Sequence, residues 1–82
     1  MIYNIQFKPK AVKDLKNLPA TNQSRIFEKI EELRINLNGD VKRLTNFSVE
    51  YRLRVGDYRA LFDVVGQTII IYRIRHRGEA YQ

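Results

Sequence analysis

The chain has 82 residues, with 15 Lys and Arg against 9 Asp and Glu, and it contains no Cys, no Trp and one Met. This length is that of one small domain, and 44% apolar with 29% charged residues is the composition of a folded protein rather than of a disordered or membrane chain. The lack of cysteine excludes disulfides, thiolate chemistry and Cys-ligated zinc, and it fits a reducing compartment. The net charge of +6 favours an anionic partner.

The sequence predicts neither a membrane span nor a signal peptide. Its longest wholly apolar run is 69–71, far shorter than the roughly 20 residues that a span needs. The first four residues lack the basic and apolar zones of a signal peptide. We therefore expect a cytoplasmic protein.

The first part of the chain predicts a strand followed by a helix. Apolar and polar residues alternate over 2–7, as in a strand with one apolar face, and this strand ends at Lys8-Pro9. Proline is suited to the first turn of a helix, and Ala11, Leu15 and Leu18 then fall on one stripe. We expect this helix to stop at Pro19.

A second, longer helix is predicted after a short connection. Thr21 is a suitable N-cap, and Asn38-Gly39 supplies the C-terminal stop. Between them, apolar residues recur at spacings of four, three and four: Ile26, Ile30, Leu33 and Leu37. Because the connection 18–21 is so short, the two helices should run antiparallel and pack as a hairpin.

From Val49 the apolar period changes to two, which predicts strands over 49–55, 58–65 and 68–75. Two-residue turns at Gly56-Asp57 and Gly66-Gln67 join them. The run 69–71 suggests a central strand covered on both faces for part of its length. The predicted fold is α+β: an N-terminal strand, an antiparallel two-helix hairpin, then an antiparallel β-meander with the helices on one sheet face.

The basic residues differ in kind between the two halves. Residues 1–40 carry seven basic and five acidic side chains, and residues 41–82 carry eight and four, so the excess rises from +2 to +4. Arginine has a planar fork of donors that suits phosphate and stacks on bases, so a concentration of arginines indicates an anionic partner more strongly than the same number of lysines would. The alternative is an ordinary solvated basic face. Seven of the nine arginines lie in the second half: Arg43, Arg52, Arg54, Arg59, Arg73, Arg75 and Arg77.

The first turn predicts how some of these arginines meet. With 56–57 as turn residues, Arg54 lies directly across from Arg59, and Arg52 lies two residues along on the same face. Like charges placed opposite one another are unfavourable, so this face predicts an anion site. The alternative is that a nearby carboxylate neutralises the arginines within the fold, the candidates being Glu50, Asp57 and Asp63.

The second turn leaves the position of Arg75 open. A strict two-residue turn puts Ile74 across from Arg59 and sends Arg75 to the opposite face. A three-residue turn or a bulge would reverse this arrangement.

The end of the chain gathers further candidates within seven residues: Arg75, the only histidine His76, Arg77 and Tyr81. Each alone is more often an exposed or packing residue, but their coincidence with the arginine face favours a site. The sequence contains no Gly-rich phosphate loop, no paired-histidine metal spacing and no Ser or Cys nucleophile motif, so no metal or cofactor is predicted. Phosphate chemistry by basic and phenolic groups remains, or binding alone.

These residues resemble the RelE/ParE toxin superfamily, and specifically its RelE-like mRNA interferases. The similar residues are Leu44, 51–59, Ile74, His76-Arg77 and Tyr81, after the first strand and helix, so the resemblance covers essentially the whole chain. It implies a RelE-like microbial RNase-type fold with one toxin domain over 1–82. It further implies a toxin that enters the ribosomal A site, cleaves mRNA and inhibits translation, and that a cognate antitoxin neutralises in a heteromeric complex.

The resemblance also implies the site residues of a metal-independent endoribonuclease. The catalytic set is Arg52, Arg54, Arg59, Arg77 and Tyr81, with His76 as a second candidate proton carrier and Arg75 as a competing match for Arg77. Because arginine stays protonated at ordinary pH, the general base is left open. The expected contacts to 16S rRNA and mRNA are Lys8, Lys10, Lys13, Lys16, Lys42, Arg43 and Arg75.

Three other functions are compatible with the same residues. A ParE-like toxin that inhibits gyrase shares the fold without needing the arginine and tyrosine set. A non-catalytic nucleic-acid-binding domain would use the same basic face. A toxin that has lost its activity would survive as a transcriptional partner of its antitoxin.

Overall fold

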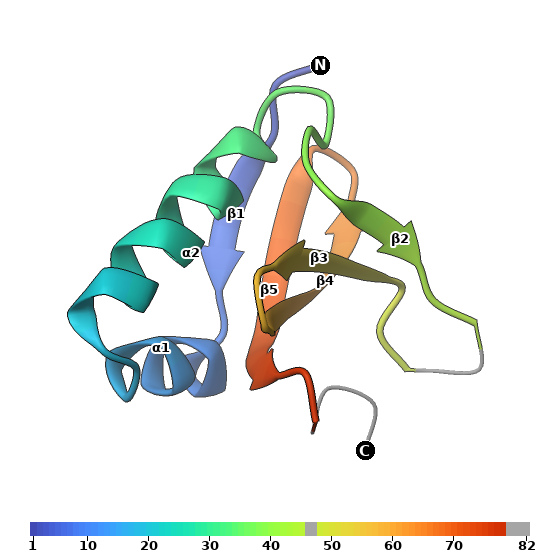
Figure 1. The fold of residues 1–82 in the computed structure, drawn as a ribbon. Helices are drawn as coiled ribbons and strands as arrows, with labels where there is room; N and C mark the ends of the chain where they lie inside the picture. Colours follow the sequence, from blue (N-terminus) through green and yellow to red (C-terminus); the bar gives the residue numbers. More distant parts are fainter. Residues whose placement is uncertain (46–47, 79–82) are drawn as a thin grey trace.

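The chain forms a five-stranded sheet with two helices on one face (Figure 1). This computed structural model describes residues 1–45 and 48–78. The elements in chain order are β1 (Asn4–Phe7), α1 (Pro9–Lys16), α2 (Ala20–Glu32), β2 (Val41–Arg43), β3 (Tyr51–Val55), β4 (Tyr58–Val65) and β5 (Thr68–His76). The α+β prediction of a strand, two helices and an antiparallel meander is confirmed.

The sheet has the strand order β1-β5-β4-β3-β2. β1 pairs in parallel with the first half of β5, and all other neighbours are antiparallel. The edge strand β2 was not predicted from the sequence. It has only three residues, Val41 to Arg43, too few to show an alternating pattern, and it forms by pairing with β3.

The predicted turn between β3 and β4 is confirmed, because Val55 pairs with Tyr58 and Arg54 with Arg59. Gly56 has φ +60 and Asp57 has a negative φ. A positive φ at the first turn residue alone is the type II′ pattern, which favours glycine there. This turn sets the register of the hairpin and therefore which side chains share a face.

A β-bulge in β5 decides between the two arrangements that the sequence left open. Leu61 pairs with Arg73 but Phe62 pairs with Ile71, so Tyr72 is an extra residue on β5. The second turn has two residues, and the bulge then brings Arg75 directly across from Arg59.

The predicted bounds of the second helix were wrong at both ends. α2 begins at Ala20 after the extended Pro19, so Thr21 lies in its first turn rather than at the N-cap. It ends at Glu32 and does not continue to Leu37. The backbone N–H of Tyr3 donates to the carbonyl of Arg34 at 2.8 Å, so the N-terminus pairs with residues that the apolar pattern assigned to the helix. Leu37 itself has φ +56, outside the helical region.

The core lies between the helices and the sheet. The helical contribution is Ala11, Ile26 and Ile30, followed by Leu33 just after α2. The sheet contributes Leu53, Val55, Ala60, Phe62, Ile69, Ile71 and Ile74. Because strand side chains alternate, the residues between these positions point to the other sheet face, which the helices do not cover.

Candidate phosphate-binding site

Three arginines form a row across the uncovered sheet face. Arg54 on β3 pairs with Arg59 on β4, and Arg59 pairs with Arg75 on β5. We refer to these three residues as the arginine row. Directly paired residues have Cβ atoms about 4.5–5.5 Å apart, so three cationic side chains start from neighbouring positions. The bulge in β5 is what adds the third member.

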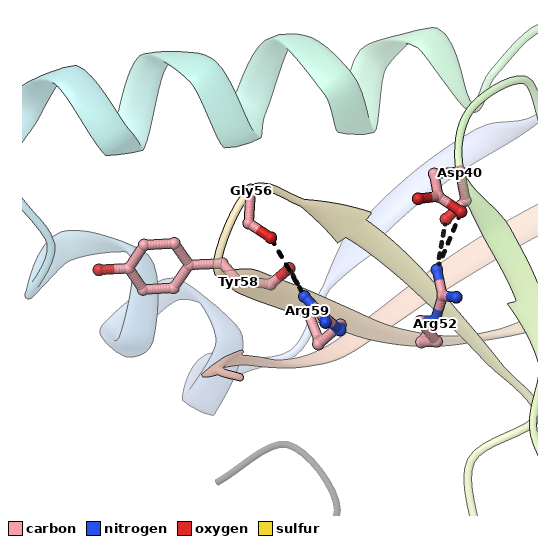
Figure 2. Close-up of polar contacts among 5 residues, drawn as sticks. All are labelled: Asp40, Arg52, Gly56, Tyr58 and Arg59. Atoms are coloured by element: carbon pink, nitrogen blue, oxygen red, sulfur yellow. Dashed lines mark hydrogen bonds and ion pairs between the residues drawn. The ribbon is translucent and has the colours of Figure 1, made fainter. Parts of the chain in front are cut away.

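Within residues 1–45 and 48–78, none of the three arginines of this row forms an ion pair with a carboxylate. The charge of Arg75 acts on a carboxyl group of that part of the chain, Asp14, without forming an ion pair. The Nη1 of Arg59 donates to the carbonyl oxygens of Gly56 at 3.3 Å and Tyr58 at 3.1 Å (Figure 2). These neutral acceptors orient the guanidinium but leave its charge in place, which suits an anionic ligand.

The arginines that flank the row are each held by a carboxylate. The Nη1 of Arg52 donates to the carbonyl oxygen of Asp40 at 2.8 Å and to its Oδ1 at 3.2 Å (Figure 2). Arg73 forms a forked pair with Asp14, at 2.8 Å from Nε and 3.0 Å from Nη2. The sequence missed both carboxylates as partners. The predicted neutralisers Glu50, Asp57 and Asp63 form no ion pair with an arginine within the described ranges.

Asp14 also completes the edge of β5. β1 pairs with β5 only as far as Ile71, so the later part of β5 has no strand on that side. There the Oδ2 of Asp14 accepts the backbone N–H of Ile74 at 3.0 Å, which attaches α1 to the strand edge. Partial burial raises the pKa of the Asp14 carboxyl, but the hydrogen bonds from Arg73 and Ile74 and the charges of Arg73 and Arg75 outweigh it and lower the pKa.

His76 lies on the opposite side of β5 from the arginine row. His76 pairs with Tyr58, and Tyr58 pairs with the buried Val55. Paired residues share a face of the sheet, so His76 lies on the face that the helices cover. The rings of His76 and Tyr58 meet edge to face with centroids 5.5 Å apart, and the hydroxyl of Tyr58 accepts the Nδ2 of Asn22 on α2 at 3.2 Å. Figure 2 shows the Tyr58 ring extending away from Arg59. The structure therefore separates the histidine from the arginines with which the sequence grouped it.

The two remaining tail candidates lie beyond β5. The backbone N–H of Arg77 donates to the carbonyl of Asp57 at 2.6 Å, which places Arg77 beside the turn between β3 and β4. Tyr81 lies outside the described residues. Of the two competing arginines, Arg75 is the one in the arginine row.

The other predicted RNA-contacting residues are spread over several elements. Lys8 and Lys10 line a groove together with Arg73, and Lys42 pairs with Arg52 across β2 and β3. Lys13 and Lys16 are exposed in the last turn of α1, and the exposed Arg43 pairs with Tyr51.

Two further properties concern the part of the chain that the structure describes. It contains no group of three or more His, Cys, Asp or Glu residues arranged to hold a metal ion. Neither α1 nor α2 has the length and apolar character needed to cross a membrane.

Comparison with known proteins decides the family. A family model described as the ParE toxin of the type II toxin-antitoxin system parDE matches residues 5–81. The chain belongs to the RelE/ParE toxin superfamily. It is 38% identical to Toxin RelE3 of Methanocaldococcus jannaschii over 94% of this chain and 93% of that protein. The resemblance inferred from the sequence is confirmed.

Solved structures of superfamily members show the same fold. The toxin in the RelB-RelE antitoxin-toxin complex from Methanococcus jannaschii has 39% identity and a TM-score of 0.75, with 92% of this chain and 93% of that chain covered. The archaeal RelE-RelB complex from Pyrococcus horikoshii OT3 has 30% identity and a TM-score of 0.77, with 98% and 100% covered. The RelE-like fold predicted for this chain is thereby confirmed.

Proposed function

We propose that this RelE/ParE superfamily toxin is a ribosome-dependent endoribonuclease that cleaves mRNA in the A site and so inhibits translation in the cytoplasm. The observation that supports this is the arginine row, three cationic side chains on adjacent strands with no carboxylate partner in the described ranges. The 38% identity to Toxin RelE3 gives independent support for a RelE-type toxin.

The reaction that fits this row is cleavage by the substrate's own 2′-hydroxyl. The 2′-oxygen bonds to the adjacent phosphorus and gives its proton to a base, the bond to the 5′-oxygen breaks, and the leaving 5′-oxygen takes a proton. The products are a 2′,3′-cyclic phosphate and a 5′-hydroxyl. Negative charge grows on the phosphoryl oxygens during this step. Arg54, Arg59 and Arg75 provide forked donors that strengthen as this charge develops, and Arg77 beside the turn adds a fourth.

We assign proton transfer to Tyr81 rather than to His76. His76 packs against Tyr58 on the side of the sheet that faces α2, away from the row. An arginine cluster lowers the pKa of a nearby phenol, which would make Tyr81 a better proton carrier. Arg52 is held by Asp40, so its role in this proposal is to position β3 and to add positive potential.

The partners of this toxin would be a cognate antitoxin, the ribosome and mRNA. The solved relatives from M. jannaschii and P. horikoshii are RelB-RelE complexes, which supports an antitoxin that forms a heteromeric complex with this chain. With a net charge of +6, the toxin favours an acidic antitoxin segment that folds on contact. The predicted RNA-contacting residues away from the row would bind phosphates of ribosomal RNA and mRNA, so ribosome binding should weaken steeply with salt. These residues are Lys8, Lys10, Lys13, Lys16, Lys42 and Arg43.

The test is induced expression followed by mapping of mRNA ends on translating ribosomes. We expect wild-type protein to produce ends clustered at A-site codons. Arg59→Ala and Tyr81→Phe should each reduce cleavage by about 100-fold or more, because each removes a group that acts in the transition state. His76→Ala should cleave far better than Tyr81→Phe, and Lys29→Ala on α2 serves as the control for loss of one charge elsewhere. Full toxicity of both Arg59→Ala and Tyr81→Phe would contradict the assigned site.

Gyrase inhibition is the second candidate, because the family model that matches the chain is that of the ParE toxin. A gyrase inhibitor has no need of the arginine row. Pulse labelling after induction separates the two: an early stop of thymidine incorporation selects gyrase inhibition, whereas an early stop of amino-acid incorporation selects mRNA cleavage.

A further inference from the structure

A groove of about 470 Å³ is lined by Arg73, two residues before Arg75 of the arginine row, and the mechanism above makes no use of its aromatic ring. Lys8 and Lys10 line it at the start of α1, Tyr72 and Arg73 line it from β5, and Asp63 lines it from β4. Val49, in the segment before β3, adds an apolar surface. The volume of the groove falls in the range of small-molecule and cofactor sites, roughly 300–1,000 Å³.

The bulge in β5 is the reason that this groove has both an aromatic ring and a guanidinium. In a regular strand, adjacent side chains point to opposite faces. Tyr72 is the extra residue of the bulge, and it and Arg73 line the same groove although they are neighbours in sequence. A straight β5 would place one of the two on the other face.

The chemistry of the groove suits one nucleotide unit. Two cationic side chains, Lys8 and Lys10, line one end of it, while Arg73 is paired with Asp14. The carboxylate of Asp63 lies at Tyr72, away from α1, where the charge of Glu50 also acts. Burial raises the pKa of the Tyr72 hydroxyl, and the negative charge and hydrogen bond of Asp63 raise it further, so the ring carries a neutral phenol at physiological pH. A neutral aromatic ring stacks on a base, and the lysines match a phosphate.

Arg73 connects the groove to the arginine row along β5. Arg73 and Arg75 are two residues apart and pair with Leu61 and Arg59 on the same face. Two residues of strand span about 6.6 Å, a step comparable to one nucleotide of an extended single strand. A phosphate held at the row therefore leaves the neighbouring nucleotide at the groove.

We propose that this groove is the subsite for the nucleotide next to the scissile phosphate, with its base stacked on Tyr72 and its outer phosphate held by Lys8 and Lys10. The proposal rests on the proposed RNA cleavage for its substrate class. Arg73 lies between the two sites, and its pairing with Asp14 fixes the guanidinium at their border.

The experiment measures binding rather than cleavage, so that it stands apart from the test of the proposed function. The probe is a short single-stranded oligoribonucleotide with 2′-O-methyl groups, which block attack by the 2′-oxygen. An abasic oligonucleotide of the same length presents the same phosphates without bases. Dissociation constants for both are measured with the purified full-length chain and its variants. Amide NMR shifts of Val49, Asp63 and Arg73 report whether the groove is occupied.

Tyr72→Leu should weaken binding of the base-bearing oligonucleotide by about 5- to 160-fold, because stacking on an aromatic residue contributes ~1–3 kcal/mol per base. It should leave binding of the abasic oligonucleotide unchanged, and Tyr72→Phe should bind both like wild type. The double variant Lys8→Ala, Lys10→Ala should weaken both oligonucleotides, and Lys29→Ala should weaken neither to that extent. Circular dichroism of each variant confirms that the fold is kept.

The outcomes separate this proposal from the proposed function. Equal losses of both oligonucleotides in Tyr72→Leu, or no binding by wild type, would overturn the groove as a base subsite even if the toxin cleaves mRNA on ribosomes. Base-dependent binding through Tyr72 without any A-site cleavage would keep the groove as an RNA site and reject the endoribonuclease. An acidic peptide that displaces neither oligonucleotide supports the RNA subsite, and one that binds the groove far more tightly than RNA would contradict it.

Discussion

Two rows of residues cross strands β3, β4 and β5 side by side, one position apart. The first consists of Leu53, Ala60 and Ile74, which are buried beneath the helices. The second is the arginine row, on the face that the helices leave uncovered. The same three strands and the same register produce both rows. A shift of one residue along the strands therefore separates the side chains that stabilise the fold from those that we propose for function.

The largest expected effect is on the covered face. Phe62 is fully buried and stacks on Tyr51 with ring centroids 5.4 Å apart. Phe62→Ala should lower the free energy of unfolding by about 3–5 kcal/mol, because it leaves a cavity in the core. Urea denaturation followed by circular dichroism measures this. A loss below about 1 kcal/mol would show that the core collapses around the gap.

Asp14→Asn tests the contact between α1 and the edge of β5. It removes a charged partner of Arg73 and weakens the acceptor of the Ile74 N–H, so we expect a loss of about 1–3 kcal/mol at pH 7. The folded state lowers the pKa of Asp14, so its contribution is present above the unfolded pKa of roughly 3.9 and disappears as the pH falls through the lower folded value. Urea titrations at pH 7 and pH 3 should therefore show a smaller difference from wild type at pH 3. An equal difference at both values would reject the charge-based explanation.

Gly56→Ala tests the turn that sets the offset between the two rows. A side chain at φ +60 is strained, and we expect a loss of about 1–2 kcal/mol. The added Cβ would meet the guanidinium of Arg25 no closer than 3.5 Å, an ordinary contact, so the cost comes from the backbone. Thermal unfolding measures it, and Asp57→Ala at the next position, where φ is negative, is the matched control.

The smallest effect, with the opposite sign, is expected on the uncovered face. Arg59→Gln relieves the repulsion from Arg54 and Arg75 and should raise the free energy of unfolding by about 0.2–1 kcal/mol at low salt. The gain should shrink as added salt screens the charges. Denaturant titrations at two ionic strengths check this, and a destabilised Arg59→Gln would mean that the hydrogen bonds of Arg59 to the turn outweigh the repulsion.

Local patterns were sufficient for much of the fold. Alternating residues in 51–55 and 58–65 and a glycine turn fix the register of β3 and β4, so the opposition of Arg54 and Arg59 was predicted correctly. Pro9 marks the start of α1 as expected. These features depend on neighbours within a few residues, which is the range that sequence periodicity and turn preferences report.

The features that the sequence did not reveal depend on distant contacts. α2 ends early because residues near Ile35 pair with the N-terminus, more than 30 positions away. Asp14 meets Arg73 across 59 positions, and nothing in the local pattern around either residue indicates the pair. His76 is separated from the arginine row because neighbouring strand residues point to opposite faces. Which face each residue at the end of β5 takes depends on the bulge, and the sequence did not reveal the bulge.

Because of the bulge at Tyr72, the number of residues in β5 decides which side chains lie on the uncovered face. Upstream of the bulge, Ile69 and Ile71 face the core, and downstream Ile74 does so, although Ile74 is three positions after Ile71 rather than two or four. A related chain can carry arginine at the positions of Arg59 and Arg75 and still lack the arginine row if its last strand runs straight. For such relatives, the number of residues between the Gly66 turn and the final arginine is as informative as the arginine itself.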